Sequence, residues 1–375
     1  IITAGLVQAG LPFAEACLYV HSTCVEITPI ASSNVYVASP YINLVGILND
    51  VLGVPAPGEN QTKGSPVVDS YAQLMDEYYE RLARAIRDAV VQQNTAQATR
   101  RYHGGYPLLS CFVNDCLGRG KDIDHGGARY NWIEPSFVGL ANLVDALAAI
   151  RKLVFVQKTI SMTGLVDALC ADFVGYEHLR QQLVTQAPKY GNDHDDVDEI
   201  VQEITAFLVE ECARYRTYLG GDFHPGLFCW IMHEHLGRVT GATADGRPAA
   251  FPLADGSGAA QGRERLGPTA ALRSATKWDH RPMLGGVAVN LKFTPSQDRR
   301  GFVETLQTIL EAFLRMGGFE VQVNVVDKET LLAAQVHPEQ YGDLVVRVAG
   351  YSDYFVSLPP GMQHEVIMRT EHGAH

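Results

Sequence analysis

The last third of the sequence alternates between strand-like and helix-like hydrophobic patterns, and this alternation most limits the folds open to the chain. Apolar, β-branched runs at 285–293, 320–326 and 344–348 indicate strands. The segments between them, 302–314 and 328–335, have the apolar spacing of amphipathic helices. Strands that alternate with helices are typical of α/β proteins whose neighbouring strands run parallel. We therefore predict an α/β fold.

The earlier part of the chain carries weaker signals of the same two kinds. Helices are expected where apolar residues recur at helical spacing, in 1–19 with a break at Gly10, and in 71–92, 140–156 and 198–219. Strands are expected in the apolar runs 20–29 and 106–113. Residues 237–268 are dense in glycine and proline, which predicts a long functional loop. Within it, Arg247 is a candidate clamp for a carboxylate or a backbone carbonyl.

Composition and charge exclude several classes of function. The chain has 375 residues, 46% of them hydrophobic, which is enough for a sizeable core. Its net charge of −12 argues against nucleic acid or an anionic membrane surface as the main partner. No run approaches the ~18 apolar residues of a membrane span, and no signal peptide is evident. Because the chain opens without methionine inside a helical pattern, we expect an N-terminal portion to lie outside it.

Cysteine and histidine usage gives no expectation of a bound metal or cofactor. The seven cysteines are odd in number and lack paired metal-type spacing, which indicates reduced thiols in a cytoplasmic protein. His224, His233 and His235 lie near Glu234, but the His-Glu-x-x-His order of a zinc site is missing. The pair Gly126-Gly127 before an arginine lacks the remaining residues of a phosphate-binding loop. We therefore expect no metal and no nucleotide.

Cys24 and Glu26 stand two residues apart in the apolar run 20–29. If the backbone is extended there, both side chains point to the same side and can face one small ligand. An internal cysteine is often only a small core residue. A buried carboxylate beside a thiol, however, needs a compensating reason for its burial.

Gly350 interrupts an apolar segment, 344–358, and has two interpretations. It can supply a positive φ in a turn between two strands. It can also be chemical, because an α-carbon without a side chain lets a radical flatten and delocalise into both flanking peptide groups. The loop by itself leaves both interpretations open, and the choice needs a second reactive group elsewhere.

The Cys24-Val25-Glu26 segment and the Arg347–Tyr351 segment together supply that second group. As a pair they resemble the C-terminal half of a glycyl radical enzyme, in the pyruvate formate-lyase-like family and closer to its diol- and choline-cleaving eliminases. The resemblance covers nearly the whole chain. Further segments fall where that family has recurrent motifs: 126–131, 241–247, 252–256, 267–269, 290–295 and 363–370.

The resemblance implies an architecture for the whole protein. The family has a ten-stranded α/β barrel, of which this chain would supply about the second half, with the Cys24 loop and the Gly350 loop meeting at its centre. Residues 1–235 would carry the cysteine loop and the half-barrel. Residues 236–375 would form a C-terminal glycyl radical domain continuous with it. Alone, such a half has exposed strand edges, so we expect it to be inactive and poorly soluble.

The resemblance also implies a mechanism. A separate radical S-adenosylmethionine activase would remove a hydrogen atom from Gly350, and the stored radical would pass to a protonated Cys24 thiol. The thiyl radical would take a hydrogen atom from a small-molecule substrate, and Glu26 would act as general base. The expected partners are this substrate, the activase and a second copy of the chain in a homodimer. No bound cofactor is implied.

The residues around Cys24 disfavour some reaction types of the family and leave others open. Thr23 stands where acyl-transferring members have a second cysteine, so a formate C-acyltransferase is disfavoured. Ile27 replaces the proline of the diol and choline enzymes, and 27–44 contains no aspartate for a substrate hydroxyl. A C–O, C–N or C–S eliminase is the first choice and an arylacetate decarboxylase the second. An inactive truncated homologue is a further alternative. The presence of Cys24, Glu26 and Gly350 argues against it.

Overall fold

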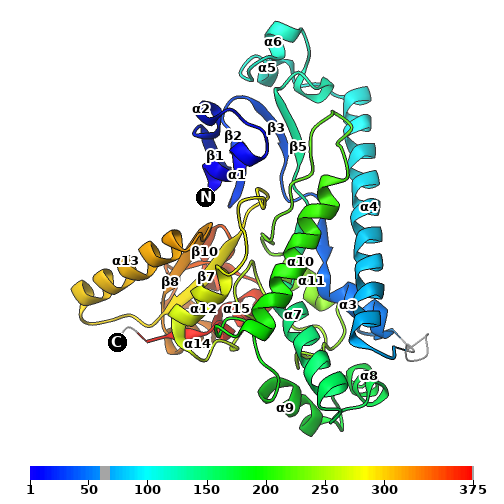
Figure 1. Ribbon diagram of the computed structural model, residues 1–375. Helices are drawn as coiled ribbons and strands as arrows, with labels where there is room; N and C mark the ends of the chain where they lie inside the picture. Colours follow the sequence, from blue (N-terminus) through cyan, green and yellow to red (C-terminus); the bar gives the residue numbers. More distant parts are fainter. Residues whose placement is uncertain (60–67, 374–375) are drawn as a thin grey trace.

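The structure, a computed structural model, describes residues 1–59 and 68–373. Figure 1 shows the long helix α4 (Tyr71–His103) along one side of the molecule and the C-terminal part, with β7 (Ala288–Phe293) and β8 (Glu320–Val325), on the other. Between them stands α10 (Asp195–Ala213). Helices and strands are intermixed along the chain, so the predicted α/β class is confirmed.

Parallel pairing dominates the strands that alternate with helices. The parallel pairs join β3 (Ser33–Tyr36) to β5 (Tyr130–Ile133), β4 (Tyr41–Asn43) to β6 (Ser136–Val138), and β7 to both β8 and β11 (Glu371–His372). Two antiparallel hairpins complete the set, β1 (Tyr19–Ser22) with β2 (Glu26–Pro29) and β9 (Val345–Arg347) with β10 (Ser352–Tyr354). Among the described residues these strands form separate sheets of two or three strands.

The main core surrounds helix α7 (Leu140–Ala149), in which all residues are buried. Apart from Asn142 and Asp145 this helix is apolar, as is typical of a helix in the middle of a protein, and it is packed against α3 (Leu44–Leu52) and α10. It continues into the π-helical turn η2 (Ile150–Val156). The helix predicted at 140–156 is therefore confirmed, with a change of winding at Ile150.

The remaining helices lie mostly on the outside of this core. They are α1 (Ile2–Gln8), α2 (Phe13–Ala16), α5 (Pro107–Ser110), α6 (Cys116–Arg119), α8 (Met162–Cys170), α9 (Glu177–Thr185), α11 (Met232–Arg238), α12 (Gly267–Ala275), α13 (Arg299–Arg315), α14 (Lys328–Val336) and α15 (Pro360–Met368). The helices predicted at 302–314 and 328–335 correspond to α13 and α14. Short 3-10 turns, η1 (Ile123–His125), η3 (Pro338–Gln340) and η4 (Phe355–Ser357), link some of them.

Two predicted strands are wrong in instructive ways. The run 106–113 forms the short helix α5, which Pro107 starts from the first helical position, where its missing N–H costs nothing. Its Leu108 is 76% exposed, so this apolar run is not a buried strand. The run 20–29 is a hairpin instead of one strand, because the chain reverses at Thr23, whose φ is 60°.

The long loop after α11 is organised by Arg247, as the sequence suggested. The guanidinium is buried and donates hydrogen bonds to the carbonyl oxygens of Thr240, Gly241, Pro248 and Phe251. Burial lowers the pKa of Arg247 to about 10. The arginine is therefore a clamp for backbone carbonyls, and its two terminal nitrogens, Nη1 and Nη2, donate within the loop.

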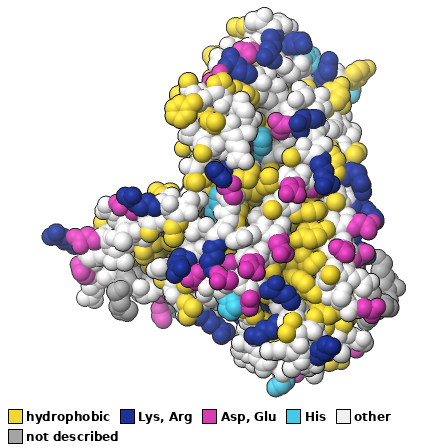
Figure 2. All heavy atoms as spheres, viewed as in Figure 1, with side chains coloured by type: hydrophobic (Ala, Val, Ile, Leu, Met, Phe, Trp, Pro, Cys, Tyr) yellow, Lys and Arg dark blue, Asp and Glu magenta, His cyan; other side chains and the backbone are white. Residues whose placement is uncertain are grey.

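The surface mixes apolar and charged groups. Figure 2 shows patches of hydrophobic side chains between clusters of acidic and basic ones on the face that it presents. Over residues 1–59 and 68–373, no helix has both the length and the hydrophobicity of a membrane span.

Candidate active site

Cys24 lies at the tip of the β1–β2 hairpin. The two strands pair from Tyr19 opposite Pro29 to Ser22 opposite Glu26, which leaves the three residues 23–25 as the turn. Thr23 adopts the left-handed conformation that reverses the chain. The expectation that Cys24 and Glu26 share one face of an extended strand is therefore wrong, although both remain at the same hairpin tip.

Glu26 folds its side chain back over this turn. One carboxylate oxygen, Oε2, accepts hydrogen bonds from Thr23 Oγ1 at 3.0 Å, Cys24 N at 3.2 Å and Val25 N at 3.1 Å. The other oxygen, Oε1, is buried and has no hydrogen-bond partner among the described residues. The hairpin thus holds the carboxylate through Oε2, and Oε1 has no hydrogen bond that would compete with a ligand.

Both functional groups at the tip have shifted acidities. Burial raises the pKa of Glu26, and its three hydrogen bonds only partly oppose this effect. Burial and, next, the negative charge of Glu26 raise the pKa of the Cys24 thiol. At neutral pH the sulfur therefore keeps its hydrogen, which suits hydrogen-atom transfer and not nucleophilic attack.

Gly350 occupies the turn of the β9–β10 hairpin and has a φ of +78°. Its N–H donates to Gln322 Oε1 at 3.0 Å, and the same oxygen accepts from Arg347 Nε at 3.2 Å. Gly350 is buried together with Val348 and Ala349. The turn interpretation of this glycine is thus confirmed, and it is compatible with a chemical role.

The two hairpin tips touch each other. A Cβ atom placed on Gly350 would lie 2.2 Å from Cys24 Cβ, 2.9 Å from Cys24 Sγ and 2.9 Å from Phe228 Cε2. Because a Cα–Cβ bond is about 1.5 Å long, the Gly350 α-carbon lies within about 4.4 Å of the Cys24 sulfur. Only a residue without a side chain fits this contact, so the geometry gives a packing reason for glycine beside the chemical one.

A second buried carboxyl group, Glu134, lies close to this site and was missed from the sequence. It directly follows β5, and its Oε1 accepts from Trp132 Nε1 at 2.9 Å. Its Oε2 is buried without a hydrogen-bond partner among the described residues. Burial, and then the charge of Glu26, raises the pKa of Glu134 well above its usual range. A glutamate inside the apolar run 130–138 was the available signal.

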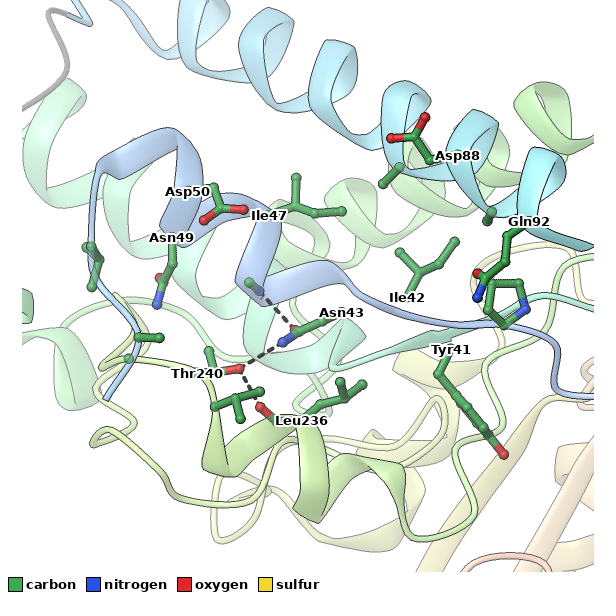
Figure 3. A pocket seen from close by; sticks show the side chains of 18 residues that line it. Tyr41, Ile42, Asn43, Ile47, Asn49, Asp50, Asp88, Gln92, Leu236 and Thr240 are labelled. Atoms are coloured by element: carbon green, nitrogen blue, oxygen red, sulfur yellow. Dashed lines mark hydrogen bonds between the residues drawn. The ribbon is translucent and has the colours of Figure 1, made fainter. Parts of the chain in front are cut away.

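Tyr41, at the start of β4, borders the same region. Burial raises the pKa of its phenol, and the charges of Cys229, Glu26 and Cys24 raise it further, which places the phenol near all three. On its other side, β4 borders an open groove of about 540 Å³ between α3, α4 and α11. In Figure 3 the Tyr41 side chain points away from the Asn43–Thr240 hydrogen bond that crosses this groove.

The other residues that the sequence singled out do not join the site as a group. His224 packs edge-on against Trp132, and burial lowers its pKa to about 4. His235 is exposed on α11, whereas His233 is fully buried, so the histidines do not converge. Arg129, after the glycine pair, forms ion pairs with Asp115 and Glu15. Its guanidinium is therefore already paired with carboxylates.

Comparison with known families agrees with this arrangement. The Pyruvate formate lyase-like family matches residues 1–237, which include the Cys24 hairpin. The Glycine radical family matches residues 253–356, which include Gly350.

Several characterised proteins are similar over almost the whole chain. Trans-4-hydroxy-L-proline dehydratase of Clostridioides difficile is 36% identical over 99% of this chain and 48% of its own length. Isethionate sulfite-lyase of Oleidesulfovibrio alaskensis is 34% identical over 98% of this chain and 46% of its own length. The glycerol-bound B12-independent glycerol dehydratase of Clostridium butyricum superimposes with a TM-score of 0.94 at 35% identity, over 100% of this chain and 48% of the dehydratase.

The chain thus spans about half the length of the relatives that it matches. Its two family matches together cover both hairpin tips of the candidate site. The chain therefore belongs to the pyruvate formate lyase-like family of glycyl radical enzymes.

Proposed function

We propose that this chain carries the radical site of a lyase that removes a leaving group from a small organic substrate. The observation that supports the proposal is the contact between Gly350 and Cys24, which joins a side-chain-free α-carbon to a protonated thiol inside the protein. In the proposed whole protein, the other half of the ten-stranded barrel, outside this chain, would complete the enclosure of this contact.

The first step is a hydrogen-atom transfer between the two hairpin tips. A separate activating enzyme of the radical S-adenosylmethionine class removes one hydrogen atom from Gly350. The glycyl radical then takes the hydrogen atom of the Cys24 thiol, so a C–H bond forms and an S–H bond breaks. Burial of 348–350 keeps bulk water away from the stored radical.

The second step takes place on the substrate. The Cys24 sulfur radical takes a hydrogen atom from a substrate carbon and becomes a thiol again. Glu26, through its free Oε1, accepts a proton from the substrate radical while the neighbouring leaving group departs with its electron pair. The product radical regains a hydrogen atom from Cys24, and the sulfur radical passes back to Gly350.

The relatives favour elimination over decarboxylation. A dehydratase and a sulfite-lyase match 99% and 98% of this chain, whereas the indoleacetate decarboxylase of Tractidigestivibacter scatoligenes matches 85%. The proposed substrate class is accordingly a small molecule with a hydroxyl, amine or sulfonate leaving group. A homodimeric assembly and a cytoplasmic location complete the proposal.

Electron paramagnetic resonance tests the radical directly. The gene product that contains this chain is activated without oxygen, and its spectrum is compared with those of the Gly350→Ala and Gly342→Ala variants. We expect a glycyl doublet in the wild type and in Gly342→Ala, whose added methyl group meets open space. Gly350→Ala is expected to show none.

Stability measurements separate the chemical from the packing effect of Gly350→Ala. The added methyl group also overlaps Cys24 and requires a left-handed alanine, which costs about 1–2 kcal/mol. A fall in the unfolding midpoint is therefore expected, so the fold is somewhat perturbed in this variant. A wild-type protein that is activated correctly yet gives no doublet contradicts the proposal.

A further inference from the structure

A second group of buried polar side chains lies outside the radical site. It consists of Cys229, before α11, His233, on α11, and Asp255, in the loop that follows. Each offers one ligand atom, and these atoms all lie within 4.8 Å of one another. Cys229 Sγ is 3.3 Å from His233 Nδ1 and donates to Asp255 Oδ1 at 2.6 Å.

Surrounding side chains orient two of these three groups as they do in metal sites. The far ring nitrogen of His233, Nε2, faces the Glu365 carboxylate at 3.6 Å and has no hydrogen-bond partner among the described residues. Carboxylates commonly hold the far nitrogen of a metal-binding histidine in this way. The outer oxygen of Asp255 accepts a hydrogen bond from Asn290, which leaves Oδ1 directed at the cysteine.

Three charged side chains surround the cluster. Asp255 and Glu365 supply two buried carboxylates. Arg369 provides one guanidinium, which donates from Nε to Glu365 Oε1 and from Nη2 to Glu365 Oε2 and lies 3.7 Å from Asp255.

We infer that Cys229, His233 and Asp255 form a binding site for a divalent transition-metal ion of the zinc class. Thiolate, imidazole and carboxylate together favour zinc over magnesium or calcium, and three protein ligands leave one tetrahedral position for water.

Metal binding requires only a small movement. Ligand atoms around tetrahedral zinc stand about 3.4 Å apart. The Sγ–Nδ1 distance of 3.3 Å already fits, and the Sγ–Oδ1 distance of 2.6 Å opens when the metal replaces the thiol hydrogen between the two atoms. The ion would join 229–233 to the C-terminal part of the chain, next to Phe228, which borders Gly350.

The site escapes sequence inspection because no linear motif contains it. Cys229 and His233 are four residues apart, but Asp255 comes from a separate loop, and the histidines nearest in sequence lie elsewhere. Glu365, whose carboxylate faces His233, comes from yet another segment, near the end of the chain.

Cobalt substitution of the purified gene product that contains this chain tests the inference. Co²⁺ is titrated into metal-free wild type, Cys229→Ser and Cys212→Ser, and near-ultraviolet thiolate-to-metal absorption is recorded. We expect saturation at one ion per chain in the wild type and in Cys212→Ser, whose cysteine is buried away from this cluster. Cys229→Ser should lose the absorption. Persistence of the band in Cys229→Ser, or no band in the wild type, overturns the inference.

X-ray absorption of zinc-loaded wild type gives a test that depends on no variant. We expect a shell with one sulfur at about 2.3 Å and the remaining ligands nitrogen or oxygen. A shell without sulfur, or loss of all zinc on simple dialysis, overturns the inference even if Cys229→Ser does not fold.

Discussion

The two carboxylate oxygens of Glu26 have different surroundings, and we assign them different roles. Oε2 holds the hairpin turn through three hydrogen bonds, whereas Oε1 is buried with no partner among the described residues. An unpaired buried carboxylate oxygen costs free energy that the protein must recover elsewhere. A proton-accepting role at the proposed substrate site accounts for that cost.

Replacing Glu26 by glutamine separates these two uses. The amide oxygen can still accept from Thr23, Cys24 and Val25, so the hairpin and the Gly350 radical should form as in the wild type. Turnover should fall by about 10²-fold or more, because the amide cannot accept the substrate proton. Radical yield and kcat are measured on the same samples. Glu77→Gln, on the outer part of α4, is the matched control and should change neither.

The pH dependence of kcat should follow the two raised pKa values at the hairpin tip. Glu26 must be ionised to act as base, so activity falls as pH drops through a value above 4.5, its ordinary pKa. Cys24 must keep its hydrogen, so activity falls again only as pH rises through a value above 9.0. An anaerobic pH–rate profile checks both limbs. An acid limb below 4.5 would contradict the assignment of Glu26.

At the scale of elements, the sequence predicted what depends on periodic apolar residues. The helix at 328–335 and the strand at 320–326 repeat their apolar residues regularly, and both are present. The hairpin at Cys24 was not predictable in this way, because it depends on a left-handed Thr23 and on hydrogen bonds from one side chain. Glu134 was missed because it comes close to Glu26, 108 residues away in sequence, only in the folded chain.

The contact between Gly350 and Cys24 also could not be predicted from local sequence patterns. Neither loop alone indicated it, and a resemblance between the two loops and a known family supplied the expectation. Their approach depends on how β9–β10 and β1–β2 are placed by the intervening core, which no local pattern encodes. The geometry of the contact could come only from the folded chain.

Strand β8 positions the Gly350 turn through Gln322. Its Oε1 accepts from both Gly350 N and Arg347 Nε, so Gln322→Ala removes two hydrogen bonds, worth about 1–3 kcal/mol together. We expect radical formation to persist but the radical to decay faster, since the turn is held less tightly. Decay of the glycyl signal after activation is the measurement. Gln307→Ala, on the exposed face of α13, is the control, and equal decay in both variants would contradict a positioning role.

At the scale of the whole molecule, the two reactive loops come from opposite ends of the chain. The Cys24 hairpin lies within the first family match and Gly350 within the second, and the core around α7 separates them in sequence. Contacts between such distant segments form only when the entire chain is folded. The proposed radical is therefore stored at a contact that depends on the complete fold.

Oxygen should reveal where the radical resides. When the activated protein is exposed to air, a radical on Gly350 is expected to cause backbone cleavage there and to release residues 351–375 on denaturation. Mass spectrometry under denaturing conditions identifies the fragment. Activated Gly350→Ala is the control and should remain intact. Cleavage of the wild type at another residue would assign the radical elsewhere.

Contacts of the segment beyond Gly350, which includes the short strand β11, should keep this segment bound to the rest of the protein after cleavage. Strand β11 lies beyond the cleavage point, yet it pairs with β7, and Lys292 of β7 donates to the carbonyl of Ile367. Arg369 reaches back to the carbonyl of Arg347 on the other side of the break. A protein cut at Gly350 should thus keep its severed tail and elute from a sizing column like an intact one. Measurements of size under native conditions would therefore not distinguish the cleaved, inactive protein from the intact one.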